Sequence, residues 1–335
     1  MFARIFLTVF ILCIAITVPA QQKRFSFTEP KMGAPFTIVF YSDDTLHATS
    51  LAKRCFNLAD SFIFIFSDYI DSSELEKLSA SAVLNAPAVP VSPTLLDILV
   101  LSQNAFIKSE GAFDITIGPL VKLWRKIRKT KQWPSKETVA SIRSLIGFDK
   151  MTIDTVQKKV RMLSPGMQLD LGGIAQGYIA QKIIDFLNTQ QVKHALVNAS
   201  GDIVVSGAPP GSPGWAIGVN VPGKTDELLA QNLLMQNKAV TTSGDAYQFM
   251  EHAGKRYSHI IDPGTGYGVT AQRNVTVIAA DGATADWLAT ACSIITIKRA
   301  KRLAMQMGAQ VLITEIKKGK LIYHATKGFA HYWKR

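Results

Sequence analysis

The chain of 335 residues has only three cysteines, Cys13, Cys55 and Cys292. Exported domains that depend on disulfides have an even set of closely spaced cysteines, so a disulfide framework is excluded here. One bridge between Cys55 and Cys292 is allowed, but both lie in helical patterns, which favours two buried thiols. Cys13 follows Leu12, whereas lipid attachment needs a small residue at that place, so we expect no lipid.

After the first 20 residues, the sequence has no uninterrupted apolar stretch of the roughly 20 residues that a helix needs to cross a bilayer. The apolar run Ile5–Val18 follows a short basic start with Arg4 and ends in the small-residue exit Val18-Pro19-Ala20. This arrangement is typical of a secretory signal peptide. We therefore predict a signal peptide at 1–20 and export of residues 21–335 to the periplasm, with contact at the inner membrane left open.

No segment rich in proline, glycine and serine divides the chain, and no internal repeat is visible, so we predict one large domain over 21–335. The patterns predict helices at about 46–66, 92–110, 174–188, 284–296 and 299–307, and strands at 36–41, 195–197, 203–206, 215–221, 257–261 and 275–279. This order does not repeat a regular strand–helix unit. It favours an α+β fold with largely antiparallel sheets over a doubly wound sheet.

Acidic residues are in the minority, because 25 Asp and Glu stand against 37 Lys and Arg and give a formal charge of +12. A basic surface attracts anionic lipid, nucleic acid or phosphorylated substrate, and charge alone does not choose among them. Many basic residues lie at 122–136 and at the C-terminal end. No RNA-binding module that combines aromatic and basic residues is visible. We predict no nucleic-acid partner and a solvated loop for 122–136.

The densest pattern is the segment 170–178, DLGGIAQGY, in which two adjacent glycines open an amphipathic helix. Gly172 and Gly173 let a ligand approach the backbone, and the free N–H groups and dipole of a helix N-terminus favour an anion. The spacing is not that of a dinucleotide-binding GxGxxG motif. The segment is a candidate phosphate site, and an ordinary glycine-rich helix entry is the alternative.

Asp286 and Thr290 stand four residues apart in the predicted helix 284–296 and therefore share one face. A carboxylate and a hydroxyl are hard oxygen ligands that suit Mg²⁺, which completes its octahedron with water and substrate phosphate. The alternative is an N-terminal aspartate that stabilises the helix dipole, with Thr290 packed beside it.

His259 is the best candidate for a general base, because it lies where a predicted strand runs into the Asp262-Pro263-Gly264 turn. An imidazole has the unperturbed pKa nearest neutrality and can take a proton from an attacking hydroxyl. Two further segments, 111–120 and 240–245, mix small residues with carboxylates and can hold a planar ring, with Phe113 or Tyr69 as walls. Loops capped by their own Asp or Ser are the alternative.

These segments, in this order, resemble the ApbE family of FAD:protein FMN transferases over nearly all of the predicted mature chain. The resemblance rests on 32–34 (MGA), 67–69 (SDY), 73–75 (SEL), 111–124 (GAFDITIGPLVKLW), 170–178, 195–203 (ALVNASGDI), 242–245 (TSGD), 257–266 (YSHIIDPGTG), 275–279 (VTVIA) and 285–290 (ADWLAT). One such motif is weak support, whereas a collinear set is specific. The resemblance implies an ApbE-like, T-fold-like single domain.

The resemblance also implies functional residues. The positions expected to line an FAD site are Met32, Tyr69, Ala112, Phe113, Asp114, Asp170, Gln176 and Ile260. Mg²⁺ is expected at Asp286 and Thr290 with the main-chain carbonyl of Gly173. His259 is similar to the histidine that activates the acceptor hydroxyl, and Ser243 is expected close to the flavin.

The implied activity is Mg²⁺-dependent transfer of FMN from FAD to a Thr or Ser hydroxyl, with AMP released. FAD is then a substrate, and the acceptors are flavoprotein subunits of membrane redox complexes or exported flavoproteins. Two alternatives stay open: hydrolysis of FAD to FMN and AMP, and binding of FAD without turnover. Three positions depart from the family pattern: Gln176 in place of Lys, Ser79 near a position often occupied by Asn, and Ala289 in place of a second acidic ligand. Gln176 and Ala289 support binding of FAD without turnover, and Ser79 bears on the adenine-side contacts.

Overall fold

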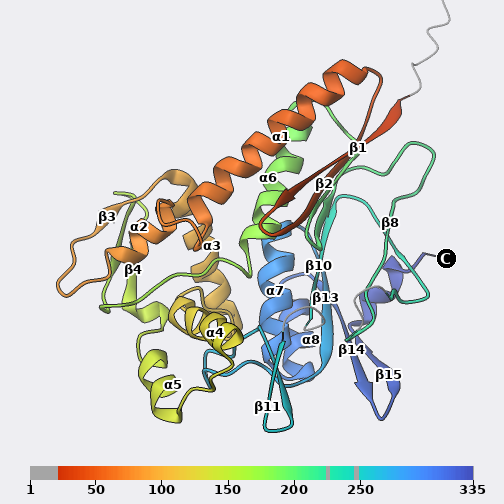
Figure 1. Ribbon diagram of the computed structural model, residues 1–335. Coiled ribbons are helices and arrows are strands. Elements are labelled where there is room, and N and C mark those ends of the chain that lie inside the picture. The colour runs from red at the N-terminus through yellow and green to blue at the C-terminus, as the bar shows by residue number, and fades with distance from the viewer. Residues whose placement is uncertain (1–21, 224–226, 245–248, 335) are drawn as a thin grey trace, which may run out of the picture.

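The computed structural model describes residues 22–334 except 224–226 and 245–248. At its centre lies an eight-stranded antiparallel sheet in the order β1-β2-β6-β7-β10-β13-β14-β15 (Figure 1). Its strands are β1 (Lys23–Lys31), β2 (Ala34–Ser42), β6 (Ala195–Ala199), β7 (Asp202–Val205), β10 (Lys238–Ser243), β13 (Arg273–Ala279), β14 (Gln310–Lys317) and β15 (Lys320–Ala325).

Three smaller antiparallel sheets surround this centre in the described ranges. Their strands are β3 (Val89–Pro90), β5 (Lys159–Met162) and β4 (Met151–Asp154), then β11 (Phe249–His252) with β12 (Lys255–Ser258), and β8 (Trp215–Ile217) with β9 (Leu233–Met235). The helices are α1 (Thr45–Phe66), α2 (Glu74–Ala80), α3 (Pro93–Ser109), α4 (Gly118–Thr130), α5 (Lys136–Arg143), α6 (Ala175–Thr189), α7 (Gly282–Ile294) and α8 (Ile297–Gln306), with short 3₁₀ turns η1 (Phe148–Lys150) and η2 (Lys327–Tyr332).

The central sheet is covered on both faces, which explains why β13 is buried along its whole length. Helices α6 and α7 pack on one face, and the segment with β8 and β9 covers the other (Figure 1). Val275 and Val277 of β13 therefore join the main core, while Ile278 joins a second core with Trp215. The polar side chains of β13, such as Asn274 and Thr276, are buried for the same reason.

The prediction of an α+β fold with largely antiparallel sheets is confirmed, and the five predicted helices appear within two residues of their expected ends. Cys55 and Cys292 are separate buried thiols, as the helical patterns favoured. No helix in the described ranges is long and apolar enough to span a membrane. The predicted signal peptide at 1–20 lies outside the described residues.

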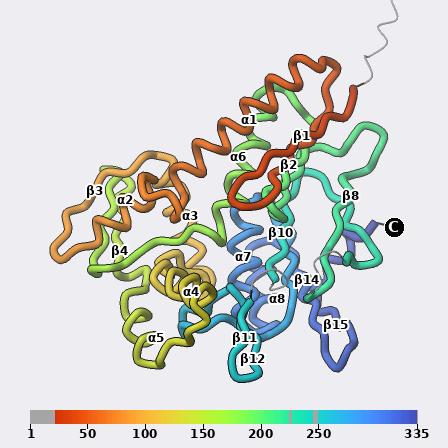
Figure 2. The backbone as a smooth tube through the Cα atoms, in the orientation of Figure 1, coloured from red at the N-terminus to blue at the C-terminus, as the bar shows by residue number. Residues whose placement is uncertain are grey.

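The prediction of a solvated loop at 122–136 is wrong for most of its length, because α4 extends to Thr130. Trp124 and Ile127 are buried on the inner side of α4, whereas Lys126 and Lys129 are exposed. After α4, the ring of Trp133 stacks on His252 of β11 with 4.0 Å between centroids. Figure 2 shows α4 and α5, in yellow, beside the hairpin β11–β12, in cyan.

Two predicted strands are shorter than expected. β12 ends at Ser258, because the Oγ of Ser258 accepts the N–H of Ile260 and bends the chain at His259. β8 ends at Ile217, and Asn220 pairs with Leu228 instead of continuing the sheet.

The sequence analysis also missed several elements, among them β10, where it expected a turn. The missed elements are β1, β3, β4, β5, β9, β10, β11, α2, α4 and α5. For α2, a signal was available: the Oγ of Ser73 accepts the N–H of Glu76 at 3.0 Å, in a Ser-x-x-Glu capping pattern.

Helices α6 and α7 approach each other at two glycines, Gly177 and Gly282. A Cβ at Gly177 would overlap the carbonyl oxygen of Gly282 and lie 2.8 Å from the Cβ of Asp286. A Cβ at Gly282 would likewise overlap the carbonyl oxygen of Gly177. Only glycine at both places allows this contact between the two helices.

We predict that Gly177→Ala lowers the free energy of unfolding by about 3 kcal/mol, at the upper end of overpacking effects, because the atom it meets belongs to rigid backbone. Urea denaturation monitored by tryptophan fluorescence measures the change. Asn188→Ala, at an exposed site on the same helix, should change stability by less than about 0.5 kcal/mol. Equal stability of Gly177→Ala and the unsubstituted protein would show that the contact between α6 and α7 does not require glycine at position 177.

Candidate functional site

The first turn of α6, the helix α7 and the segment 111–118 meet at Gly173. A Cβ at Gly173 would lie 3.0 Å from the Oγ1 of Thr290 and 3.2 Å from the ring of Phe113. The backbone of Gly173 is therefore in contact range of a hydroxyl from α7 and of an aromatic ring. The structure brings Gly173 and Thr290 together as the sequence analysis predicted.

Asp286 lies one turn before Thr290 on α7 and is only 4% exposed. Its Oδ2 accepts the N–H of Gly177 at 3.1 Å. The pKa of Asp286 is raised well above its ordinary value, first by burial and then by the negative charge of Asp202, while the bond from Gly177 acts in the opposite direction. Asp286 does not cap its helix, because Asp281 is the N-cap and accepts the N–H of Thr284.

Asp202 is a buried carboxylate that the sequence analysis did not single out. It begins β7, is 6% exposed and accepts the hydroxyl of Thr241 at 2.6 Å. Burial raises its pKa to about 6, and the bond from Thr241 opposes this rise. Asp202 falls within the segment 195–203, but nothing in the sequence shows that β7 lies beside α7.

The donor set of Asp286, Thr290 and the Gly173 carbonyl fits a hard divalent cation. Carboxylate, hydroxyl and carbonyl oxygens are the ligands that Mg²⁺ takes, together with water and substrate oxygens. A cation here would also offset the two negative charges of Asp286 and Asp202, which burial makes unfavourable. Within the described ranges, no cluster of three or more His, Cys, Asp or Glu side chains could hold a metal. The fit therefore depends on the mixed donor set.

The segment 111–118 runs beside the segment 168–173. The N–H of Asp170 donates to the carbonyl of Ile115 at 2.7 Å, and Ile117 forms a bridge with Gln168. Ala112 and Phe113 are buried there, and Phe113 lies 6.2 Å from the ring of Trp287. These contacts place two of the predicted FAD-lining residues, Ala112 and Phe113, next to the Gly173 turn.

Asp114 turns its carboxylate inward. Its Oδ1 accepts the N–H of Thr116 at 2.8 Å and the hydroxyl of Thr116 at 2.7 Å. Burial raises the pKa of Asp114 to about 6, against the effect of the bonds from Thr116. In this structure Asp114 stabilises its own loop, which is the alternative that the sequence left open.

Asp170 and Tyr69 are joined by Arg125 of α4. The Nη2 of Arg125 lies 3.1 Å from the Oδ2 of Asp170, and its Nη1 contacts Asp68. The guanidinium lies over the ring of Tyr69, 4.1 Å from the centroid. The Oδ1 of Asp170 accepts the N–H of Gly172 at 2.7 Å. Tyr69, Asp170 and the glycine turn thus form one connected group.

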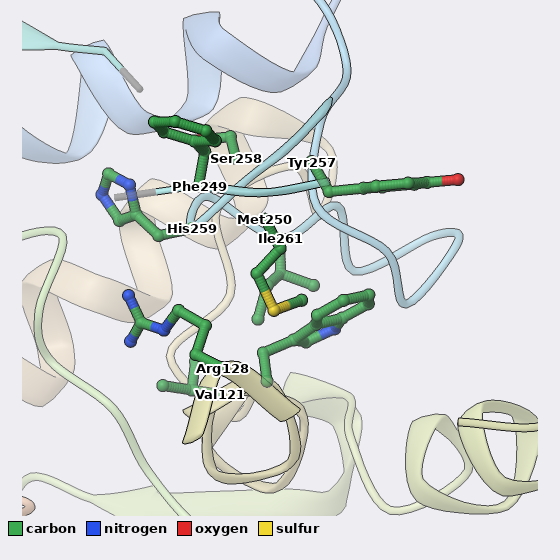
Figure 3. Close-up of a pocket in the computed structure, with 9 residues that line it drawn as sticks. Val121, Arg128, Phe249, Met250, Tyr257, Ser258, His259 and Ile261 are labelled. Atoms are coloured by element: carbon green, nitrogen blue, oxygen red, sulfur yellow. The ribbon is translucent and has the colours of Figure 1, made fainter. Parts of the chain in front are cut away.

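His259 lies in a second group, around a small cavity between α4 and the hairpin β11–β12. The cavity is lined by Val121, Trp124, Arg128, Phe249, Met250, Tyr257, Ser258, His259 and Ile261. Figure 3 shows the polar ends of His259 and Arg128 on the same side, with Tyr257 pointing away. His259 is exposed and Ile260 is buried. The helix α4 links the two groups, because Trp124 lines this cavity while Arg125 contacts Asp170.

The other predicted positions are less directly connected. Met32 lies in the β1–β2 turn and packs against the main core, which also contains Phe113 and Ala175. Gln176 is half-buried in the first turn of α6. Ser243 ends β10, beyond which Asp245 lies outside the described residues.

The comparisons with known proteins identify the family of the chain. The model of the ApbE family matches residues 32–313. The chain belongs to the ApbE family. It is 31% identical over 268 residues to an FAD:protein FMN transferase of Klebsiella pneumoniae, covering 80% of this chain and 81% of that protein.

Solved ApbE structures have the same fold. The apo flavinyl transferase ApbE of Pseudomonas stutzeri superposes with a TM-score of 0.81 at 26% identity, covering 93% of this chain and 97% of that one. The apbE protein of Thermotoga maritima gives a TM-score of 0.82 at 26% identity, covering 93% and 100%. The family resemblance and the ApbE-like fold predicted from the sequence are confirmed.

For this ApbE member, the expectation of a helix start with free N–H groups needs a correction. The N–H of Gly172 donates to Asp170, those of Ile174 and Ala175 to the carbonyl of Leu171, and that of Gly177 to Asp286. The turn has no side-chain cap, and most of its donors already have protein partners. Few N–H groups of this turn are therefore left to bind an anion.

Ser79, one of the departures from the ApbE pattern, has a structural role. It is buried in α2, and its Oγ accepts the N–H of Leu169 at 3.1 Å. This bond ties α2 to the strand-like segment that leads into Asp170.

The raised pKa of Asp114 predicts a pH-dependent stability. A carboxyl whose pKa rises from about 4 when unfolded to about 6 when folded adds stability at low pH, and this contribution is lost as the pH rises through 6. Asp114→Asn keeps an acceptor for Thr116 and removes the titration. Between pH 5 and pH 8, the unfolding free energy of the unsubstituted protein should fall by about 1 kcal/mol relative to that of Asp114→Asn.

Chemical denaturation of both proteins at the two pH values measures this difference. Asp43→Asn, at an exposed site, keeps Asp114 and should follow the unsubstituted protein at both pH values. A stability difference between Asp114→Asn and the unsubstituted protein that is the same at both pH values would contradict the assignment.

Proposed function

We propose that this chain is an FAD:protein FMN transferase, which cleaves FAD and attaches FMN through a phosphoester to a Thr or Ser hydroxyl of an acceptor protein. The observation that supports this most is the contact of Gly173 with Thr290 one turn from the buried Asp286, in a chain of the ApbE family. Relatives with this family's fold bear the same activity in their names.

In this proposal, different residues of the site contact the rings and the phosphates of FAD. Tyr69 offers exposed aromatic surface for the flavin or adenine ring, while the buried Phe113 packs behind the Gly173 turn. Asp170 and the Gly172 turn hold the backbone beside the phosphates. Asp286, Thr290 and the Gly173 carbonyl would bind Mg²⁺. That ion, when bound, would neutralise charge that develops on the pyrophosphate during cleavage.

His259 supplies the base in this proposal. The acceptor hydroxyl gives its proton to the imidazole while its oxygen attacks the FMN phosphorus, and the bond from that phosphorus to the oxygen of AMP breaks. His259 is exposed, which suits a base whose substrate is a side chain on another protein. Arg128 lies on the same side of the cavity as His259 (Figure 3) and adds positive charge there.

The acceptors in this proposal are exported flavoproteins or flavoprotein subunits of membrane redox complexes, and the enzyme works in the periplasm. This part is supported by the signal-like residues 1–20. Two alternatives give distinct results: a hydrolase releases AMP from FAD without any acceptor, and a binding protein releases none.

The transfer assay tests the proposal and the metal site together. Residues 21–335, FAD, Mg²⁺ and an acceptor peptide with the pattern Asp-Gly-x-Ser/Thr-Gly-Ala-Ser/Thr should yield a peptide heavier by one FMN in mass spectrometry. Asp286→Asn keeps the acceptor for Gly177 but removes a charge from the metal site, and should slow transfer by about 100-fold or more. Asp43→Asn should transfer normally. No mass gain with any divalent metal would sink the proposal.

The role of His259 has a separate test. His259→Gln should slow transfer to the peptide by about 100-fold or more, since the hydroxyl loses its base. FAD binding, measured by flavin fluorescence, should stay within about twofold. His47→Gln, at an exposed site on α1, is the matched control. Normal transfer by His259→Gln would remove His259 from the mechanism.

A further inference from the structure

Arg125 has no role in the chemistry described above, yet its guanidinium contacts two residues of the candidate FAD site, Tyr69 and Asp170, together with the neighbouring Asp68. It pairs with Asp68 and Asp170, which are 11% and 10% exposed, and it covers one face of the Tyr69 ring. We propose that Arg125 is a positioning residue that holds the Tyr69 ring and the Asp170–Gly172 turn in the geometry that binds FAD. This inference rests on the proposed function, because it concerns the same site.

The Tyr69 side chain needs such support, because it is 73% exposed. Its backbone is fixed: the N–H of Tyr69 donates to the Oγ of Ser67 at 3.1 Å, and the hydroxyl of Ser73 donates to the carbonyl of Ser67 at 2.6 Å. The ring itself has the guanidinium of Arg125 on one face. A ring held on one face leaves the other face ready to stack on a planar heterocycle at little further entropic cost.

The Nη2 group of Arg125 supports the turn that is proposed to lie beside the phosphates of FAD. Asp170 accepts Arg125 with Oδ2 and the N–H of Gly172 with Oδ1. The residue after Gly172 is Gly173, whose backbone lies beside Thr290. One arginine therefore connects an aromatic wall to the turn that presents the Gly173 carbonyl.

The charges of two neighbouring carboxylates give a second reason for a positively charged side chain at position 125. Asp68 and Asp170 both contact Arg125, and the negative charge of Asp68 raises the cost of ionising Asp170. Burial and the charge of Asp68 raise the pKa of Asp170 to about 6, and Arg125 opposes this rise. The two carboxylates in turn raise the pKa of Arg125, although burial acts to lower it.

The geometry requires arginine rather than lysine. A planar guanidinium can pair with two carboxylates and stack on an aromatic ring simultaneously, whereas an ammonium group is a compact charge. The neighbouring lysines of α4 have other environments: Lys122 pairs with Glu76 at 3.2 Å, and Lys126 is exposed. Lys126 therefore offers a matched control that removes the same charge one residue away.

The first experiment measures FAD affinity without turnover. Quenching of FAD fluorescence is titrated in metal-free protein for the unsubstituted chain, Arg125→Met, Arg125→Lys and Lys126→Met. We expect Arg125→Met to weaken FAD binding about tenfold and Arg125→Lys about threefold, with Lys126→Met unchanged. Equal affinity of Arg125→Met and Lys126→Met would overturn the inference.

The second experiment separates positioning from a merely structural role. In the transfer assay, Arg125→Met should raise KM for FAD about tenfold, while kcat changes by less than about threefold. A kcat that falls with KM unchanged would overturn the inference. If Arg125→Met does not fold, Arg125→Lys still carries the test, because it keeps the charge and should show the same KM effect in smaller size.

A double-mutant cycle tests whether Arg125 acts through the ring. The combined loss of FAD affinity in Tyr69→Leu with Arg125→Met should be smaller than the product of the single losses, since both substitutions remove the same support. If the losses of FAD affinity in the two single variants multiply in the double variant, Arg125 does not act through the Tyr69 ring. Failure of the unsubstituted protein to bind FAD would instead refute the proposed function, so the two failures can be told apart.

Discussion

The close contact of α6 with α7 at Gly177 and Gly282 determines where every other part of the site lies. Because no side chain separates the helices there, the N–H of Gly177 reaches Asp286, and the turn before α6 lies beside Thr290. A buried carboxylate and a hydroxyl from α7 thereby lie near the turn before α6, although Gly177 and Asp286 are 109 residues apart in sequence. The central sheet supports both helices from behind, through β6, β7, β10 and β13.

A second constraint is the position of α4 between two groups of functional residues. Its inner side contributes Trp124 to the cavity of His259, and the Nε1–H of Trp124 donates to the carbonyl of Gly266 at 2.9 Å. The next residue, Arg125, contacts Asp170 and Tyr69. The basic character of α4 is therefore partly internal to the site, and only residues such as Lys126 and Lys129 face solvent.

The sequence was sufficient for the long helices and for the collinear family segments, because both depend on local patterns. It was insufficient for α4, where the positive charges of Lys122–Lys131 obscured the apolar spacing of Leu120, Trp124 and Ile127. It also missed Asp202 and Arg125, since their roles arise from contacts with α7 and with the loop at 67–73, which no spacing along the chain reveals. The sequence also did not reveal that the carboxylate of Asp114 and most N–H groups of the turn at Gly172 are bonded within the protein.

The two cysteines have a consequence for how this molecule meets changing surroundings. Burial raises the pKa of both Cys55 and Cys292 to about 12, so almost no thiolate forms near neutral pH. Since the thiolate is the form that attacks oxidants and disulfides, the part of the chain that the structure describes should keep the same covalent structure under reducing and oxidising conditions alike. The fold of these residues requires neither an enzyme that forms disulfides nor a reductant that breaks them.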